Sequence, residues 1–141
     1  MILQRLALAL VFLLLTAGCG GGVGADAPNN ASADDFCAAR EWYYAEGIKR
    51  LIDGEWPPPE DDLAELAHDW AREMARVGTP ENVTPDARAG FEKFVDRFVD
   101  IDGGDMPSFD GDEHLMDPKD DEESVLLDYV TNTCGLPTPP T

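Results

Sequence analysis

The chain has little positive charge. Its 10 lysines and arginines stand against 29 aspartates and glutamates, which gives a net charge of −19 over 141 residues. A surface this acidic repels phosphate backbones and anionic lipid headgroups. The composition therefore argues against nucleic-acid binding, and charge alone favours cations and basic surfaces as partners. Many of the acids fall in the first turns of predicted helices, where negative side chains are stabilising, so a solvated, helix-capping surface is the simpler interpretation.

Residue types that usually carry catalysis are also scarce. The chain has two histidines and only three serines, and no serine lies in a Gly-x-Ser-x-Gly elbow. Ser108 and His114 share an acidic stretch, but any acidic loop with a serine and a histidine would offer the same arrangement. His68 falls away from the apolar stripe of its predicted helix and is expected at the surface. Without a nucleophile placed beside a base, an enzyme is the least favoured function class.

The chain lacks an apolar run long enough to span a bilayer. Its longest run, Leu6–Leu15, holds ten residues, whereas a spanning helix needs about 20. Arg5 precedes the run, and this charged-then-apolar order is typical of an export signal that is removed.

The run leads into a cysteine motif. Leu15-Thr16-Ala17-Gly18-Cys19 resembles the lipobox of bacterial lipoproteins, with Thr16 where that family usually has leucine. The resemblance implies that residues 1–18 are a signal peptide and that Cys19 carries acyl chains such as palmitate. These chains would attach an extracytoplasmic protein to the cell membrane. The alternative is an ordinary signal-peptide cysteine that cleavage removes. Loss of residues 1–18 takes away Arg5 and no acid, so the mature net charge would be −20.

Two further cysteines, Cys37 and Cys134, remain. An exported chain meets an oxidising compartment, where an even remainder predicts one disulfide. Two buried free thiols are the alternative. A metal site is less favoured, because neither cysteine has another cysteine or a histidine nearby in sequence.

Helical periodicity fills most of the mature chain. Apolar residues recur at helical spacing over residues 34–53, 60–77, 86–101 and 118–134. Ser32, Thr84 and Asp117 are the predicted N-caps, and the last two are followed by proline. Comparable lengths and mostly short connections predict an all-α, four-helix up-down-up-down bundle. Its first and last helices would bring Cys37 and Cys134 to the same end. An α+β arrangement with strands near residues 100–115 is the alternative.

The segments around this domain are expected to be flexible. Residues 19–33 are rich in glycine and asparagine, have almost nothing to bury and are predicted to form a tether. Residues 34–135 would be the helical domain, and the proline-rich residues 136–141 a disordered tail.

The two ends of the domain also resemble a group of proteins. An early Phe36-Cys37 and a closing Tyr-x-x-x-x-Cys-Gly pattern at Tyr129–Gly135 are similar to those of small lipoproteins of high-GC Gram-positive bacteria, whose function is unknown. The resemblance implies no particular activity. We expect a lipid-anchored interaction or binding module of the cell envelope, with another envelope protein or a basic partner as its target.

Residues 100–117 form an acidic stretch without helical periodicity. Oxygen-rich loops that contain glycines bind calcium, and five aspartates are candidate ligands: Asp100, Asp102, Asp105, Asp110 and Asp112. The match to an EF-hand loop fails, since Asp105 stands where that loop needs glycine and Gly111 where it needs glutamate. A calcium-stabilised module is therefore the alternative function, and a solvated loop is the default. No other cofactor is expected.

Two tryptophans are candidate binding residues. Trp42 falls among charged residues opposite the apolar arc of its helix, and Trp56 stands in a proline-rich turn. Together they would form an exposed aromatic patch for a partner. The alternative, which we favour, is that the turn at residues 55–59 folds back and covers Trp42.

Overall fold

The computed structural model describes residues 21–54, 58–105 and 116–135. These residues form four α-helices: α2 (Ala33–Asp53), α3 (Glu60–Val77), α4 (Pro85–Asp100) and α5 (Asp121–Cys134). A short 3₁₀ turn, η2 (Gly103–Asp105), follows α4, and the described ranges contain no β-strand beyond an isolated bridge. The all-α class is therefore confirmed.

Local capping explains where the helices begin and end. The hydroxyls of Ser32 and Thr84 accept hydrogen bonds from the backbone N–H three residues further on, at 3.0 and 3.3 Å. These bonds satisfy N–H groups that have no partner within the helix. Gly78 and Gly135 end α3 and α5 with φ of 77° and 74°, in the left-handed region that favours glycine.

The last helix begins later than predicted. α5 starts at Asp121 and not at Pro118. The carboxylate of Asp120 accepts the N–H of Glu123 at 3.0 Å, and the carboxylate of Glu123 accepts the N–H of Lys119 at 2.8 Å. These two bonds give partners to the N–H groups of Glu123 and Lys119 at the start of the helix. They therefore set the start of the helix in preference to the earlier aspartate-proline pair.

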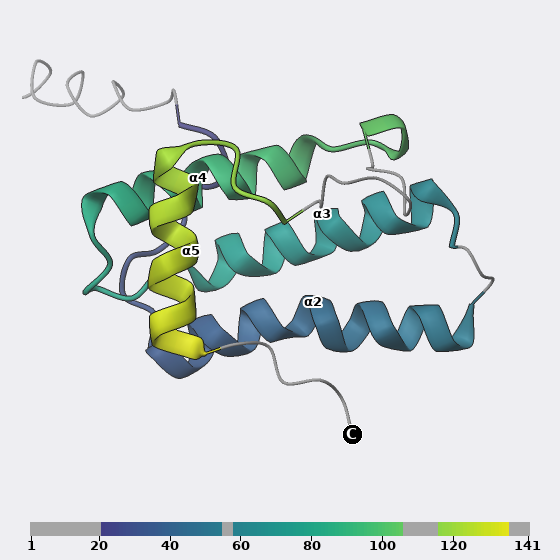
Figure 1. Cartoon of the computed structure of the whole chain (residues 1–141), viewed down its shortest axis with the longest axis horizontal. Coiled ribbons are helices and arrows are strands. Elements are labelled where there is room, and N and C mark those ends of the chain that lie inside the picture. The colour runs from purple at the N-terminus through teal and green to yellow at the C-terminus, as the bar shows by residue number, and fades with distance from the viewer. Residues whose placement is uncertain (1–20, 55–57, 106–115, 136–141) are drawn as a thin grey trace, which may run out of the picture.

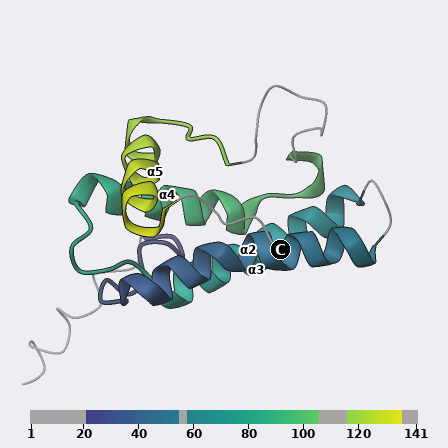
Figure 2. The ribbon, with the colours of Figure 1, turned by 60° about the horizontal axis from the view of Figure 1, so that its bottom comes forward.

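The four helices form the predicted bundle, in which α2, α3 and α4 have the up-down-up order. Figure 1 shows α2, α3 and α4 side by side and running in alternating directions, while α5 lies steeply across them near the starts of α2 and α4. Figure 2 shows the inclination of α5 from a second direction. α5 contacts both α4 and α2, so it closes that end of the bundle.

A disulfide joins the two ends of the domain. Cys37 lies near the start of α2 and Cys134 is the last residue of α5, and their sulfurs are bonded with the Cα atoms 5.4 Å apart. The predicted pairing is confirmed. The bond spans a sequence separation of 97 residues, for which the chain-entropy model gives about 4 to 5 kcal/mol of stabilisation.

Aromatic side chains occupy the centre of the core. Phe36, Trp70, Phe91 and Phe98 are at most 2% exposed. The ring of Trp70 meets that of Phe98 edge to face at 5.3 Å between centroids, which is a favoured aromatic geometry. Its indole N–H donates to the carbonyl of Ala39 at 3.1 Å. The apolar faces of α3 and α4 therefore meet in the core through these aromatic rings.

Much of the predicted tether is packed against the bundle. Ala27 is buried. The guanidinium of Arg88, on α4, donates to the carbonyl oxygens of Gly24, Ala27 and Pro28 at 3.1, 2.7 and 3.0 Å. The prediction of a free tether over residues 19–33 is therefore wrong from Gly24 onward. A largely buried arginine, distant in sequence, supplies the donors that these backbone carbonyls need.

Candidate ligand-binding site

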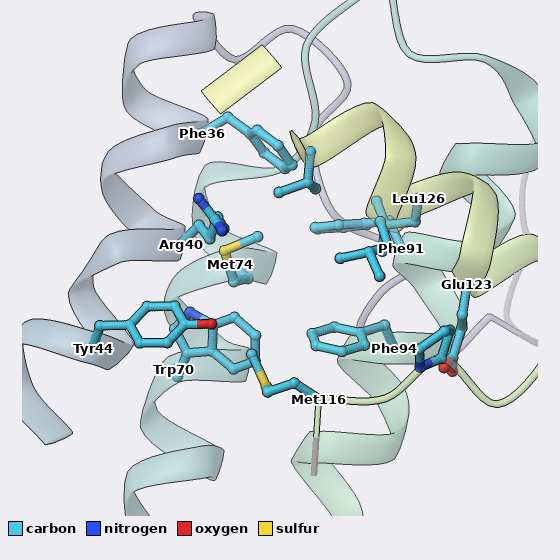
Figure 3. A pocket seen from close by; sticks show the side chains of 13 residues that line it. Phe36, Arg40, Tyr44, Trp70, Met74, Phe91, Phe94, Met116, Glu123 and Leu126 are labelled. Atoms are coloured by element: carbon cyan, nitrogen blue, oxygen red, sulfur yellow. The ribbon is translucent and has the colours of Figure 1, made fainter. Parts of the chain in front are cut away.

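An apolar cavity of about 90 Å³ lies among the four helices. Its apolar walls include Phe36 from α2, Trp70 from α3, Phe91 from α4 and Leu126 from α5. Figure 3 shows these side chains facing a common space, with Arg40 on the α2 side and Glu123 on the opposite side. The cavity thus places two ionisable groups at the rim of an aromatic and aliphatic interior.

Arg40 is the cation of this cavity. It is 9% exposed, and it follows Phe36 and precedes Tyr44 by four residues, so the three lie on one helix face. Its Nη1 donates to the carbonyl of Gly135 at 3.2 Å, and its guanidinium carbon lies 5.9 Å from the centre of the Tyr44 ring. No carboxylate of the described ranges forms an ion pair with it. Arg40 is therefore a buried charge without an opposite charge in that part of the chain.

Glu123, on the other side, is fully compensated. It is 5% exposed, and its Oε2 lies 3.0 Å from Nη2 of Arg97. The same carboxylate accepts the N–H of Lys119 at 2.8 Å. The negative charge of Glu123 is thus neutralised by Arg97, and among the described residues that line the cavity, the charge without an ion-pair partner is that of Arg40.

Tyr44 adjoins the guanidinium. The hydroxyl of Tyr44 points toward the cavity (Figure 3). Tyr43 packs beside it, with ring centroids 5.7 Å apart, and lies 5.1 Å from the ring of Trp70. Burial, together with the nearby Tyr44, raises the pKa of Tyr43 above its ordinary value of 10.0. The Tyr44 hydroxyl is therefore the phenol that lies at the cavity.

The predicted aromatic patch lies elsewhere. Trp42 is half-buried and packs against the core cluster, beside a surface hollow that Glu73 and Arg76 also line. Arg76 bonds Glu73 at 2.6 Å and holds the pKa of that carboxyl below its usual range. Trp56 and most of the turn predicted to cover Trp42 lie outside the described residues, so the pairing of the two tryptophans stays a prediction.

The acidic loop is described only in part. Asp110 and Asp112 lie outside the described residues, whereas Asp100, Asp102 and Asp105 are exposed, and Asp102 directly precedes the η2 turn. Oδ1 of Asp102 accepts the N–H of Gly104 at 2.8 Å. Within the described ranges no group of three or more acids, histidines or cysteines is placed to hold a metal ion. The calcium hypothesis therefore still depends on residues beyond those ranges.

His68 takes a structural position instead of the surface position expected from the sequence. It is half-buried, and its Nε2 contacts the carbonyl oxygen of Ile101 at the end of α4. The expectation of a solvated histidine is wrong, because the loop after α4 returns over α3. Ser108 and His114 lie outside the described residues, as does Cys19.

Sequence reasoning missed Arg40 and Tyr44. The available signal was a single cation inside an apolar stripe, since Phe36, Arg40 and Tyr44 recur every four residues. Such a cation more often extends its charged end to water along its apolar stem. Only the crossing of α5 over this face turns the position into a buried one.

The fold and the site define a class: a disulfide-closed four-helix bundle with an arginine at an apolar cavity. Compared with protein-family models, with curated proteins and with solved structures, the chain matches none. Of the helices in residues 21–54, 58–105 and 116–135, none combines the length and the apolar character needed to cross a membrane.

Proposed function

We propose that this protein is a lipid-anchored, non-catalytic binding module of the cell envelope, which takes its ligand at the cavity beside Arg40. The observation that carries this proposal is the burial of Arg40, 9% exposed, without a carboxylate partner in the described ranges. A buried charge costs free energy unless it is paired. A ligand from outside the chain would supply the missing partner.

The polar groups at the cavity support binding and not catalysis. They are a guanidinium, a phenol and the carboxylate of Glu123, which Arg97 already holds. Arginine stays protonated at any ordinary pH, and a phenol is neutral near pH 7. Neither group can therefore accept a proton as a general base there. Both can donate hydrogen bonds, and so orient a ligand.

The packed N-terminal segment supports attachment close to a membrane. The N–H of Gly24 donates to the Asp96 carboxylate on α4 at 2.8 Å, which fixes this point of the chain to the bundle. Cys19 precedes Gly24 by five residues, and five extended residues span at most about 18 Å. Acyl chains on Cys19 would keep the bundle near the bilayer although its acidic surface is repelled by anionic headgroups.

Labelling with an alkyne analogue of palmitate in a Gram-positive host tests the anchor. We expect the full chain to be labelled and to sediment with membranes, and Cys19→Ser to be unlabelled and released. Thr16→Leu, which brings the segment closer to the lipobox pattern, is the matched control and should stay labelled. An unlabelled wild-type protein, or a Cys19→Ser variant that stays on the membrane, would contradict the anchor.

A further inference from the structure

We infer that the ligand of the cavity is a single-chain carboxylate, whose acid group pairs with Arg40 and whose hydrocarbon chain enters the apolar interior. This inference rests on the proposed function and adds the chemical class of the ligand. It follows from three properties of the site: its uncompensated charge, the geometry of its donors and its size.

The charge selects an anion. Arg40 is nine-tenths buried, and its described hydrogen bond goes to a neutral acceptor, the carbonyl of Gly135. Glu123 does not oppose an incoming anion with its full charge, because Arg97 and the N–H of Lys119 hold it. A cationic or zwitterionic ligand would place positive charge beside an arginine that has no acidic partner in residues 21–54, 58–105 and 116–135. An anion supplies the opposite charge.

The donors select a carboxylate. A guanidinium offers five N–H groups in a planar fork that matches the two oxygens of a carboxylate. One of the five is engaged with Gly135. The hydroxyl of Tyr44 points toward the same space (Figure 3) and can add a third hydrogen bond to one of the oxygens. Inorganic phosphate or sulfate would carry more charge toward a protein of net charge −19 and would gain nothing from the aromatic walls.

The size selects a narrow ligand. The cavity of about 90 Å³ is smaller than the apolar cavity of about 150 Å³ that admits benzene, and far below the roughly 300 to 1,000 Å³ of pockets for drug-sized molecules. It has room for a short stretch of alkyl chain, and it is partly open, so the remainder of a longer chain can stay outside. A fused-ring acid would exceed the volume of about 90 Å³.

Calorimetric titration with hexanoate and 1-hexanol tests the inference. The two probes share the same chain and differ in the acid group. The protein is the mature chain with Cys19→Ser, which lacks only the acyl group. We expect hexanoate to bind about tenfold or more tightly than 1-hexanol, as a charge-assisted hydrogen-bonded pair implies. Hexylammonium, the cationic probe of equal length, should not bind.

Variants locate the binding. Arg40→Met should weaken hexanoate binding about tenfold or more and leave 1-hexanol binding unchanged, whereas Arg40→Lys should keep part of the preference for the acid. Arg72→Met removes an exposed cation of equal charge and should change neither affinity. Circular dichroism and melting curves verify that each variant is folded.

The outcomes separate the inference from the proposed function. Equal binding of hexanoate and 1-hexanol overturns the inference that the ligand is a carboxylate, while the cavity stays a binding site. A loss of hexanoate binding in Arg72→Met as large as in Arg40→Met does the same. Absence of binding by all three probes at millimolar concentration overturns both. Tight hexanoate binding that Arg40→Met does not weaken places the anion elsewhere and also overturns the inference.

Discussion

The two sides of α5 are built differently. Toward α4, opposite charges meet. Lys93 lies 2.7 Å from Asp120 and also contacts Glu122, and Arg97 lies 3.0 Å from the buried Glu123. All three of these ion pairs compensate charge within the chain. This side of α5 is therefore fastened by electrostatics and close packing.

Toward α2, the contact is covalent and apolar. The disulfide joins Cys37 to Cys134, the rings of Phe36 and Tyr129 lie 6.1 Å apart, and Arg40 has no acidic partner in the described residues. Atoms that line a cavity lose packing contacts, which costs stability. The difference teaches that the disulfide stabilises the side of α5 where Arg40 has no acidic partner among the described residues.

The largest effect is expected from the disulfide. Replacement of both cysteines, Cys37→Ser with Cys134→Ser, should lower the free energy of unfolding by about 4 kcal/mol, because the denatured chain regains its loop entropy. Urea denaturation of the oxidised wild type and the double variant measures the loss. A loss below about 1 kcal/mol would show that packing alone holds α5 against α2, contrary to the comparison.

The next effect is expected from the buried ion pair on the α4 side. Arg97→Met leaves the 5% exposed Glu123 without its counter-charge, and loss of one partner of such a pair costs about 3 kcal/mol. Adding Glu123→Gln to Arg97→Met should restore part of that loss, because the orphaned charge disappears. If the double variant loses as much free energy of unfolding as the two single variants together, the two side chains are not coupled.

A third variant tests the close packing of α4 against α5. A Cβ at Gly90 would lie 2.2 Å from the carbonyl oxygen of Glu122, so Gly90→Ala should force α5 outward and cost about 2 kcal/mol. Gly47→Ala is the matched control. There the nearest atom is Cδ2 of Leu66 at 3.3 Å, a movable side-chain end, and alanine should be neutral or stabilise the helix by up to about 1 kcal/mol. Equal behaviour of the two variants would contradict a tight α4–α5 contact.

Local chemistry made much of the fold predictable. Hydroxyl caps at Ser32 and Thr84, glycine stops at Gly78 and Gly135, and a 3.6-residue apolar period act within a few residues of each helix end. The sequence therefore predicted three of the four helix starts closely, and the cysteine parity predicted the disulfide. The fourth start was misplaced because both Asp117 and Asp120 can serve as the N-cap. The hydrogen bonds between Asp120, Glu123 and Lys119 favour Asp120.

Contacts between distant residues were not predictable. Arg88 donates to the carbonyl of Gly24, which lies 64 residues earlier. No short sequence pattern predicts such a long-range hydrogen bond. Arg40 looks in the sequence like a surface cation, and its burial depends on where α5 crosses α2. The cavity and its charge are therefore consequences of packing, whereas the helices that form them are consequences of local sequence.

Arg40→Met is expected to change stability little, in contrast to Arg97→Met. It leaves the carbonyl of Gly135 without its donor, but Gly135 is exposed and water can replace the bond. It also removes a buried charge that has no acidic partner in the part of the chain that the structure describes, which is favourable. The net change should stay within about 1 kcal/mol, measured by urea denaturation without ligand. A loss of unfolding free energy as large as that of Arg97→Met would mean that Arg40 stabilises the fold and does not serve as a binding group.

The smallest effect is expected at the exposed end of the α4 side, where it depends on pH. Hydrogen bonding to Lys93 lowers the pKa of Asp120 below its ordinary value of 3.8. A lowered pKa in the folded state contributes stability above the unfolded pKa, and this contribution is lost as the pH falls through the folded pKa. Lys93→Met should therefore melt slightly below wild type near neutrality, and the two melting curves should converge in strong acid.

The charge-matched control for this comparison is Lys49→Met, which removes an exposed lysine of α2 and should show no such convergence. High salt should also shrink the difference between Lys93→Met and wild type, because the pair is exposed to solvent and is screened. A difference that persists unchanged in acid and in salt would have to arise from packing of the lysine stem against α5. In that case packing contacts, and not ion pairs, would hold α5 against α4. The two sides of α5 would then no longer differ in how charge contributes to their stability.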